Sequence, residues 1–362
     1  MDIIKIITIL IIILLTFFIV FRMIQQRHRI YSMVNTENAK QESFTSSPGK
    51  TPLAINNISS ANALQPLIEY VIKASYNSAY DGTNMTLLAL DNVLSRGVRF
   101  LDFEVYSVDD SPYVAYSVDP TFSSLTSGNS LLLQDVLNEV VGNAFMGNVP
   151  NPRDPLFIHL RINTNCGLND SPACSIYQQV GAVIQNTLLP KLYVDEEGKA
   201  IPVSQATILS DIAGKIVLVM DASINRDYKN YAVCDSTDSK TCYNLKNYVN
   251  IETGGTAWKK YKFTDFLNQT QNPLTVDSTN PLKAEPKTGT LSLGLVLPNT
   301  GTNVSNTSFP LTNIATYGVQ TVALKYYKND AGLKAYEEMF NTYKTAFLPL
   351  GFAVDYITPF LI

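Results

Sequence analysis

Histidine is almost absent from this 362-residue chain, which contains only two, His28 and His159. His28 closely follows a long apolar run, so no site in the rest of the chain can hold two histidines. Positive charge is also scarce: 16% of the residues are charged, the formal net charge is −4, and no cluster of Lys and Arg alternates with aromatic residues. A polyanion-binding surface requires such a cluster, so nucleic acid is excluded as a partner.

Residues 3–21 form a nearly continuous apolar run, interrupted only by one lysine and two threonines. A helix of this length spans roughly the 30 Å of a bilayer core. Two alternatives remain. A cleaved signal peptide usually has an apolar region of about 7–15 residues followed by small residues, and a buried core helix usually has a polar face. Because Phe21-Arg22-Met23 follows the run, we predict that residues 1–29 are a single-pass transmembrane anchor with a basic flank.

Charge and cysteine placement disagree about the side of the membrane that the rest of the chain faces. The arginines after the apolar run favour the cytosol. The four cysteines lie in polar, loop-like sequence, where two local disulfides would indicate an oxidising compartment: Cys166 with Cys174 and Cys234 with Cys242. Four free thiols are the alternative, and zinc is disfavoured because no histidine lies near. A virion membrane protein of a large DNA virus, oxidised on the cytosolic side by a viral enzyme, would reconcile both indications.

The rest of the chain divides into a polar linker and a region of alternating elements. Residues 30–64 are rich in Ser, Thr, Asn, Gln and Pro and are predicted to be a flexible linker. In residues 65–362, short apolar runs alternate with helical patterns, which predicts an α/β fold, a TIM-type (β/α)8-like barrel. The predicted strands are 70–74, 100–106, 113–116, 156–161, 216–220, 248–251, 291–297, 321–326 and 352–356, and the predicted helices are 86–94, 130–145, 175–189, 263–268 and 332–347. Residues 268–309 read as an irregular excursion with room for one strand pair.

Several segments carry a resemblance to a known family. Ser75-Tyr76-Asn77-Ser78 is followed by a helix, by Arg99-Phe100-Leu101-Asp102-Phe103-Glu104-Val105 and by Tyr113-Val114-Ala115-Tyr116-Ser117. This order resembles the X region of phosphoinositide-specific phospholipase C. Residues 211–218 are similar to the family's entry into a mid-barrel strand, residues 318–324 resemble its Y region, and residues 351–354 resemble its closing strand. The resemblance covers residues 66–362 and implies a phospholipase C-like phosphodiesterase barrel.

The resemblance also implies where catalytic histidines would stand. In this family an inositol hydroxyl attacks phosphorus, one histidine stabilises the developing charge, a second transfers a proton, and calcium activates the attacking oxygen. Tyr76 takes the place of the first histidine. No histidine stands between Tyr116 and Val118, where the second is expected. A tyrosine, with a reference pKa near 10, is a poor base at neutral pH.

The resemblance further implies a set of metal ligands. Asn77 matches the family's asparagine ligand, and Asp102 and Glu104 match its two acids in exchanged order. Arg161 stands where a third acid is expected, which lowers the affinity for calcium. An arginine fills the role of the metal in calcium-independent bacterial relatives, so no cofactor is expected here. If the site is active, calcium would be held by Asn77, Asp102 and Glu104. The family's two phosphate-binding lysines fall near Val219 and Asp221.

Asp102 and Glu104 lie two residues apart on a predicted strand and therefore face the same way. Two acids inside a barrel are costly unless they are paired or functional, which marks a polar site or its remnant. Arg161 either neutralises both acids or binds substrate. His159 is interpreted as a packed or hydrogen-bonded histidine rather than a catalyst.

These observations predict a membrane-anchored, non-catalytic barrel that acts as a structural or binding protein, possible partners being a phospholipid headgroup or another protein. The alternative is an active phosphoric diester hydrolase on phosphatidylinositol or a related phosphodiester, in which Tyr76, Asn77, Asp102, Glu104 and Arg161 have altered roles. A glycosylated surface adhesin is a third interpretation, based on several Asn-X-Ser/Thr sequons.

Overall fold

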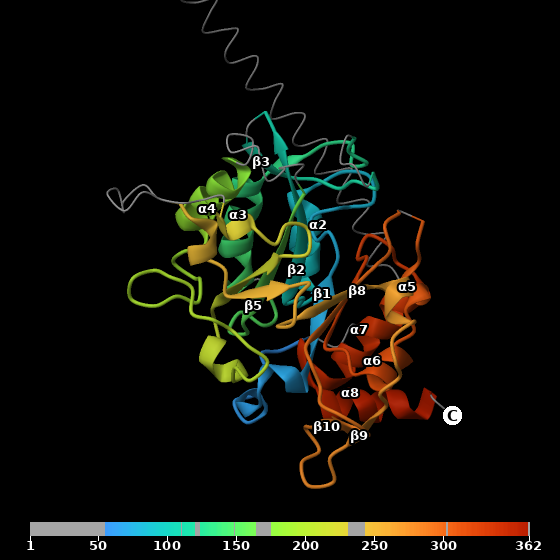
Figure 1. The fold of residues 1–362 in the computed structure, drawn as a ribbon. Coiled ribbons are helices and arrows are strands. Elements are labelled where there is room, and N and C mark those ends of the chain that lie inside the picture. Colours follow the sequence, from blue (N-terminus) through green and yellow to red (C-terminus); the bar gives the residue numbers. More distant parts are fainter. Residues whose placement is uncertain are drawn as a thin grey trace, which may run out of the picture. The chain divides into compact units, whose positions relative to one another are not determined.

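The computed structural model describes residues 55–109, 111–119, 124–147, 149–163, 175–230, 243–301 and 303–360. In this part of the chain, a path of eight hydrogen-bonded strands, each parallel to the next, forms the main sheet (Figure 1). Its members, in sheet and chain order, are β1 Tyr70–Ser75, β2 Phe100–Val108, β5 Leu156–Ile162, β6 Ile216–Asp221, β7 Ile251–Thr253, β8 Lys259–Lys262, β11 Gly294–Leu297 and β12 Thr321–Leu324. Because β12 pairs with β1, the sheet curls into a cylinder.

The barrel is nearly closed. Between β7 and β8 a single parallel bridge joins Thr253 to Trp258. Three further strands attach to the barrel in antiparallel fashion: β3 Ser111–Val114 on β2, β4 Leu131–Leu132 on β3, and β13 Phe347–Pro349 on β1. A separate hairpin of β9 Leu274–Val276 and β10 Ala284–Pro286 lies in the predicted excursion. The predicted TIM-type α/β barrel is thus confirmed in the described residues.

Helices cover the outside of the barrel, where their apolar stripes are buried. The described helices are α2 Leu87–Ser95, α3 Leu133–Ala144, α4 Ser175–Thr187, α5 Phe263–Phe266, α6 Thr312–Tyr317, α7 Ala331–Tyr343 and α8 Leu350–Ile357. Helices α3 and α4 pack together on one side, and α6 and α8 on another (Figure 1). α2 begins where Thr86 Oγ1 accepts a hydrogen bond from Ala89 N at 3.1 Å, and α7 begins at the equivalent bond between Asp330 Oδ1 and Leu333 N at 3.0 Å.

An aromatic layer fills the end of the barrel where the strands begin. The indole of Trp258, which is 0% exposed, lies 5.6 Å from the ring of Phe100 and 5.9 Å from that of Phe157. Phe157 also lies 6.2 Å from Phe347. This layer closes the end of the barrel interior where the strands begin. Polar side chains inside the barrel therefore lie toward the opposite, C-terminal end of the strands.

The structure corrects two sequence-based element assignments. Residues 352–356, predicted as the closing strand, belong to helix α8, and the strand is β13 just before it. A short apolar run fits a strand or a buried helix equally well by periodicity, which explains the error. The lysine-rich segment after Trp258, to which the sequence alone assigned no strand or helix, is strand β8.

The predicted linker also ends earlier than residue 64. Ile55 is buried, Asn56 N donates to Lys344 O at 2.8 Å, and Ile58 N donates to Asp154 Oδ1 at 2.8 Å. Residues 55–64 therefore pack on the barrel. No helix among the described residues is long and apolar enough to cross a membrane. The predicted anchor at residues 3–21 and all four cysteines lie outside the described residues.

Candidate functional site

Two neighbouring strands supply the centre of the candidate site. Every second residue of β2 and of β5 points into the barrel, and the register pairs them in three layers. Phe100 pairs with Phe157 in the aromatic layer, Asp102 pairs with His159 above it, and Glu104 pairs with Arg161 at the top. The alternation of these two strands thus places four ionisable side chains in one column above an apolar floor.

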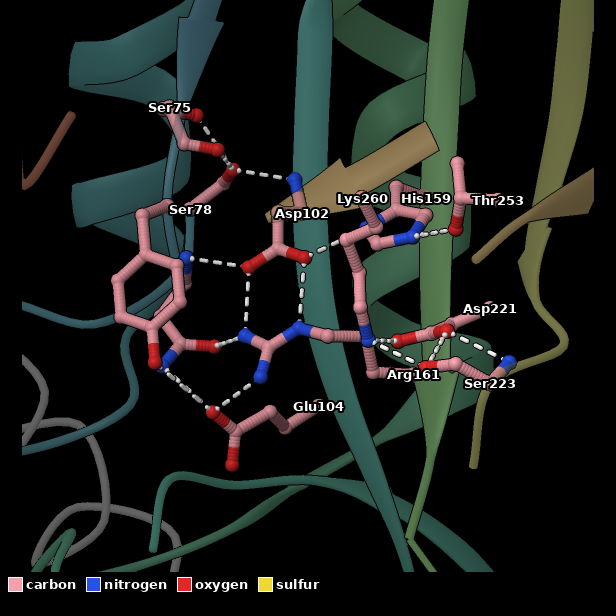
Figure 2. Close-up of polar contacts among 12 residues, drawn as sticks. Ser75, Ser78, Asp102, Glu104, His159, Arg161, Asp221, Ser223, Thr253 and Lys260 are labelled. Carbon is pink, nitrogen blue, oxygen red and sulfur yellow. Dashed lines mark hydrogen bonds and ion pairs between the residues drawn. The ribbon is translucent and has the colours of Figure 1, made fainter. Parts of the chain in front are cut away.

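Asp102 is fully hydrogen-bonded at the centre of this column (Figure 2). Its Oδ1 accepts from Arg161 Nε and from His159 Nδ1, both at 2.8 Å, and its Oδ2 accepts from Arg161 Nη2 at 2.6 Å and from Asn77 N at 3.0 Å. Burial alone would raise the pKa of Asp102, but the charge of Arg161 and the hydrogen bonds from His159 and Arg161 hold it well below its usual range. Asp102 is therefore ionised, and no lone pair of its carboxylate is left for a ligand.

Glu104 is saturated in the same way. Its Oε1 accepts hydrogen bonds from a guanidinium, an amide and a phenol, and its Oε2 accepts hydrogen bonds from a second phenol and a backbone N–H. The contacts are Arg161 Nη1 at 2.7 Å, Asn77 Nδ2 at 3.0 Å and Tyr76 OH at 3.3 Å on Oε1, and Tyr106 OH at 2.5 Å and Ser117 N at 3.3 Å on Oε2. Ser117 lies where the family's second histidine is expected, and here its backbone holds the acid.

Arg161 joins all the residues that the sequence predicted for this site. Its Nη2 also donates to Asn77 Oδ1 at 2.9 Å, and its guanidinium carbon lies 4.8 Å from the centre of the Tyr76 ring. Tyr76, Asn77, Asp102, Glu104 and Arg161 therefore surround one point. Burial would lower the pKa of Arg161, but the two carboxylates raise it well above its ordinary value, so the side chain is a permanent cation.

These residues do not fit calcium as they stand. Calcium takes six to eight oxygen ligands, and Asn77 Oδ1, both Asp102 oxygens and Glu104 Oε1 already accept hydrogen bonds from Arg161. The guanidinium occupies the centre of the would-be ligand set. Within the described ranges, no group of three or more His, Cys, Asp and Glu side chains is arranged to hold a metal ion.

The one histidine of the barrel is buried beneath this cluster. His159 is 0% exposed and is held between Asp102 and Thr253, whose Oγ1 lies 2.9 Å from Nε2. Its Nδ1 donates to the ionised Asp102, and its Nε2 is hydrogen-bonded to the hydroxyl of Thr253. The interpretation of His159 as a hydrogen-bonded core histidine is confirmed.

Burial raises the pKa of Tyr76 well above 10, so the phenol of this residue, which stands in place of the family's first histidine, stays protonated.

Sequence reasoning missed a second ion pair beside this cluster. Lys260 of β8 reaches into the barrel, where its Nζ lies 2.5 Å from Asp221 Oδ2 and 2.6 Å from Ser223 Oγ (Figure 2). The positions expected to hold phosphate-binding lysines are a buried valine, Val219, and this acid. A strand assignment for residues 259–262 would have revealed that Lys260 faces opposite to its lysine neighbour Lys259.

Another lysine stands at the end of β12. Lys325 is 0% exposed, and its Nζ donates to the backbone oxygen of Gly301. Burial, helped by the nearby charge of Lys328, lowers its pKa to about 8. No carboxylate among the described residues forms an ion pair with it. Lys325 therefore differs from Arg161 and Lys260, each of which is paired with a described acid.

Solved structures with a similar fold are known. No family model matches the chain, and no curated protein matches it. Among solved structures, PLC21 of L. pealei is similar over 83% of this chain, with a TM-score of 0.51 and 15% identity. The chain spans only 38% of the length of that structure. Phospholipases C from Streptomyces antibioticus and Listeria monocytogenes each match with a TM-score of 0.41 and 12% identity, over 79% and 76% of this chain and 99% and 94% of theirs.

The resemblance noted in the sequence therefore holds for the fold. The described residues form a phospholipase C-like barrel, similar in fold to PLC21. At this level of identity the comparison concerns architecture alone, and the activity of this chain has to be argued from its own side chains.

Proposed function

We propose that this chain is a membrane-anchored phospholipase C-like barrel without phosphodiesterase activity, acting as a structural or binding protein, with a virion membrane as its location. One observation carries the proposal: Arg161 is bound simultaneously to Asn77, Asp102 and Glu104. A site arranged in this way stabilises itself and leaves no carboxylate to act as a base or to hold a metal.

The absence of proton-transfer groups predicts a large loss of catalytic rate. A positioned general acid or base typically contributes about 10²–10⁴-fold in rate. Here Tyr76 stays protonated, His159 is enclosed, and Asp102 has a strongly lowered pKa, so none of the three serves as a proton acceptor near neutral pH. Loss of both proton-transfer groups together with the metal removes most of the chemistry that phosphodiester cleavage in this fold requires.

The charge pattern favours a structural or protein-binding role over headgroup binding. Both Arg161 and Lys260 are already paired with carboxylates. A phosphodiester bound by either of these two cations would have to displace a buried pair, which is costly because an acid would be left uncompensated. Lys325 has no ion-pair partner among the described acids, but it is fully buried and its Nζ donates to the backbone oxygen of Gly301. Binding of another protein by the loops of the barrel mouth requires no such rearrangement.

Turnover measured on the full chain tests the proposal. The protein, reconstituted into phosphatidylcholine nanodiscs, is incubated with phosphatidylinositol and with glycerophosphodiesters, with and without calcium, and product is compared with empty nanodiscs. We expect no product above background. Turnover that Asp102→Asn abolishes would overturn the proposal in favour of the active hydrolase. Resistance to extraction by alkaline carbonate is expected from the anchor, and release of the protein would contradict that part.

A further inference from the structure

A pocket unrelated to the barrel mouth lies on the outer side of β8 and β11. It has a volume of about 220 Å³. Its floor is formed by Gly294, Gly318 and Val319, and its walls come from β8 and the segments that flank the β9–β10 hairpin. Lys260 faces the barrel interior, so its neighbours Lys259 and Tyr261, two residues apart, face outward and line this pocket.

The two glycines let neighbouring side chains pack closely at the floor of the pocket. Gly318 has a φ of +67° and ends α6, and a Cβ there would stand 2.7 Å from a side-chain carbon of Leu291. A Cβ on Gly294 would approach Val319 to 3.1 Å. Larger residues at these positions would therefore be strained or would have to move their neighbours.

One wall of the pocket is aromatic. The ring of Phe266 packs edge-on against Tyr261 at 5.4 Å and against Tyr317 at 4.9 Å. Phe266 is buried, so it fixes the two tyrosines, which are only partly buried and line the pocket. Tyrosine combines an apolar ring with a hydroxyl, and rigid rings of this kind provide contact area at a low cost in conformational entropy.

The opposite wall and the rim carry uncharged hydrogen-bonding groups. They are the hydroxyls and amides of Thr270, Thr290, Ser292, Gln269 and Asn272. No carboxylate lines the pocket, and its single charged group, Lys259, forms no ion pair with any described acid. The pocket beside β7 differs, because it is lined by a carboxylate, Glu252, which pairs with Lys229, one of the pocket's two lysines, at 2.6 Å.

We propose that this pocket binds one sugar ring. Hydroxyl and amide groups can both donate to and accept from sugar hydroxyls, and an aromatic wall packs against the apolar face of the ring. The volume is below the roughly 300–1,000 Å³ of pockets for drug-sized ligands, which fits a monosaccharide unit rather than a longer chain. The unpaired Lys259 amine is placed to pair with an acidic substituent. The inference does not depend on the function proposed for the barrel mouth.

Saturation-transfer NMR on the full chain in a sugar-free detergent tests the site. The probes are four neutral sugars (glucose, galactose, mannose and N-acetylglucosamine) and two acidic ones (glucuronic acid and N-acetylneuraminic acid). We expect transfer to the ring protons of at least one probe. Thr290→Trp, which places an indole at an exposed position of the wall, should reduce that transfer to background.

Two conservative variants sharpen the test. Tyr261→Phe removes one hydroxyl and should weaken binding about 2–10-fold, the equivalent of one hydrogen bond, whereas Tyr113→Phe on β3 should leave binding unchanged. Lys259→Met should weaken the acidic probes alone, and Lys334→Met, an exposed lysine of α7, is its control. Melting curves check that each variant is folded. The proposal is wrong if no probe shows transfer, or if transfer survives both Thr290→Trp and Tyr261→Phe.

Discussion

A buried arginine and a buried aspartate lie on β5 and β2 toward the barrel mouth, a second such pair lies just before the two strands at the base of the barrel, and the two pairs behave differently. At the mouth, Arg161 contacts Asp102 directly, with 2.6 Å between Nη2 and Oδ2. At the base, Asn151 stands between Arg99 and Asp154: Arg99 Nη2 donates to Asn151 Oδ1 at 2.9 Å, and Asn151 Nδ2 donates to Asp154 Oδ2 at 3.1 Å. The aspartate pKa is lowered at the mouth and raised to about 6 at the base.

Direct contact between the charges explains the difference. Burial opposes ionisation at both ends, and it is the largest influence on both aspartates. At the mouth the ion pairs and hydrogen bonds outweigh it. At the base burial prevails and also lowers the pKa of Arg99 to about 10. Buried charges therefore do not mark a functional site by themselves, and what sets the mouth apart is that one arginine occupies the centre of a set of would-be metal ligands.

The largest expected effect is that of Arg161→Met. The substitution keeps most of the side-chain volume but leaves Asp102 and Glu104 buried without a cation. Removal of one partner of a buried pair typically costs about 3–5 kcal/mol, so the free energy of unfolding, measured by urea denaturation, should fall by about that amount. The triple variant Asp102→Asn, Glu104→Gln, Arg161→Met should regain part of the loss. A triple variant less stable than the single one would refute the pairing.

Arg99→Met at the base is the matched substitution, and its expected effect is smaller. Arg99 forms no direct contact with an acid, and its Nε has no hydrogen-bond partner among the described residues. Methionine would leave the backbone oxygens of Ala144 and Asn151 without this donor but would remove a poorly compensated charge. A loss of about 1–3 kcal/mol is expected in the same denaturation experiment. A loss equal to that of Arg161→Met would abolish the contrast between the two ends.

The pH dependence of stability should have opposite sign at the two ends. Asp154 has a pKa of about 6 in the folded protein against an ordinary value of 3.8. As the pH falls from about 7 to about 4, the folded state therefore takes up a proton at Asp154 before the unfolded state does, and it becomes more stable relative to the unfolded state. The lowered pKa of Asp102 means that its contribution persists below pH 3.8 and is lost only as the pH falls further.

Asp154→Asn isolates the contribution of the base. Denaturation at about pH 7 and about pH 5 should show that the wild type gains about 1–3 kcal/mol relative to this variant at the lower pH. An identical pH profile for the two proteins would mean that Asp154 titrates normally.

Much of the barrel could be predicted from the sequence because its central strands are continuous apolar runs with polar residues at fixed alternate positions. Asp102 and Glu104 were expected on one face of a strand, and the structure confirms this. Neutralisation of both acids was one of the two roles considered for Arg161, and its contacts agree with that role. These predictions succeeded because alternation along a strand is a local property.

Other features depend on contacts that no local pattern contains. One of the two partners of His159 is Thr253, 94 positions along the chain, in a strand of three residues. Strand β8 was missed because its lysines resemble a solvated segment, although Lys260 is held inside the barrel by Asp221. Residues 352–356 form a helix in place of the predicted strand, since a short apolar run has no decisive period.

Calcium binding measured by calorimetry on the full-length wild type and on Arg161→Asp tests most directly whether the arginine has taken the place of the cation. The wild type should show no binding heat with calcium at millimolar concentration, because Asn77, Asp102 and Glu104 are held by the guanidinium. The variant replaces the guanidinium with a third carboxylate and should bind calcium. Calcium binding by the wild type with a Kd below about 1 mM, or about −4 kcal/mol, would contradict the account.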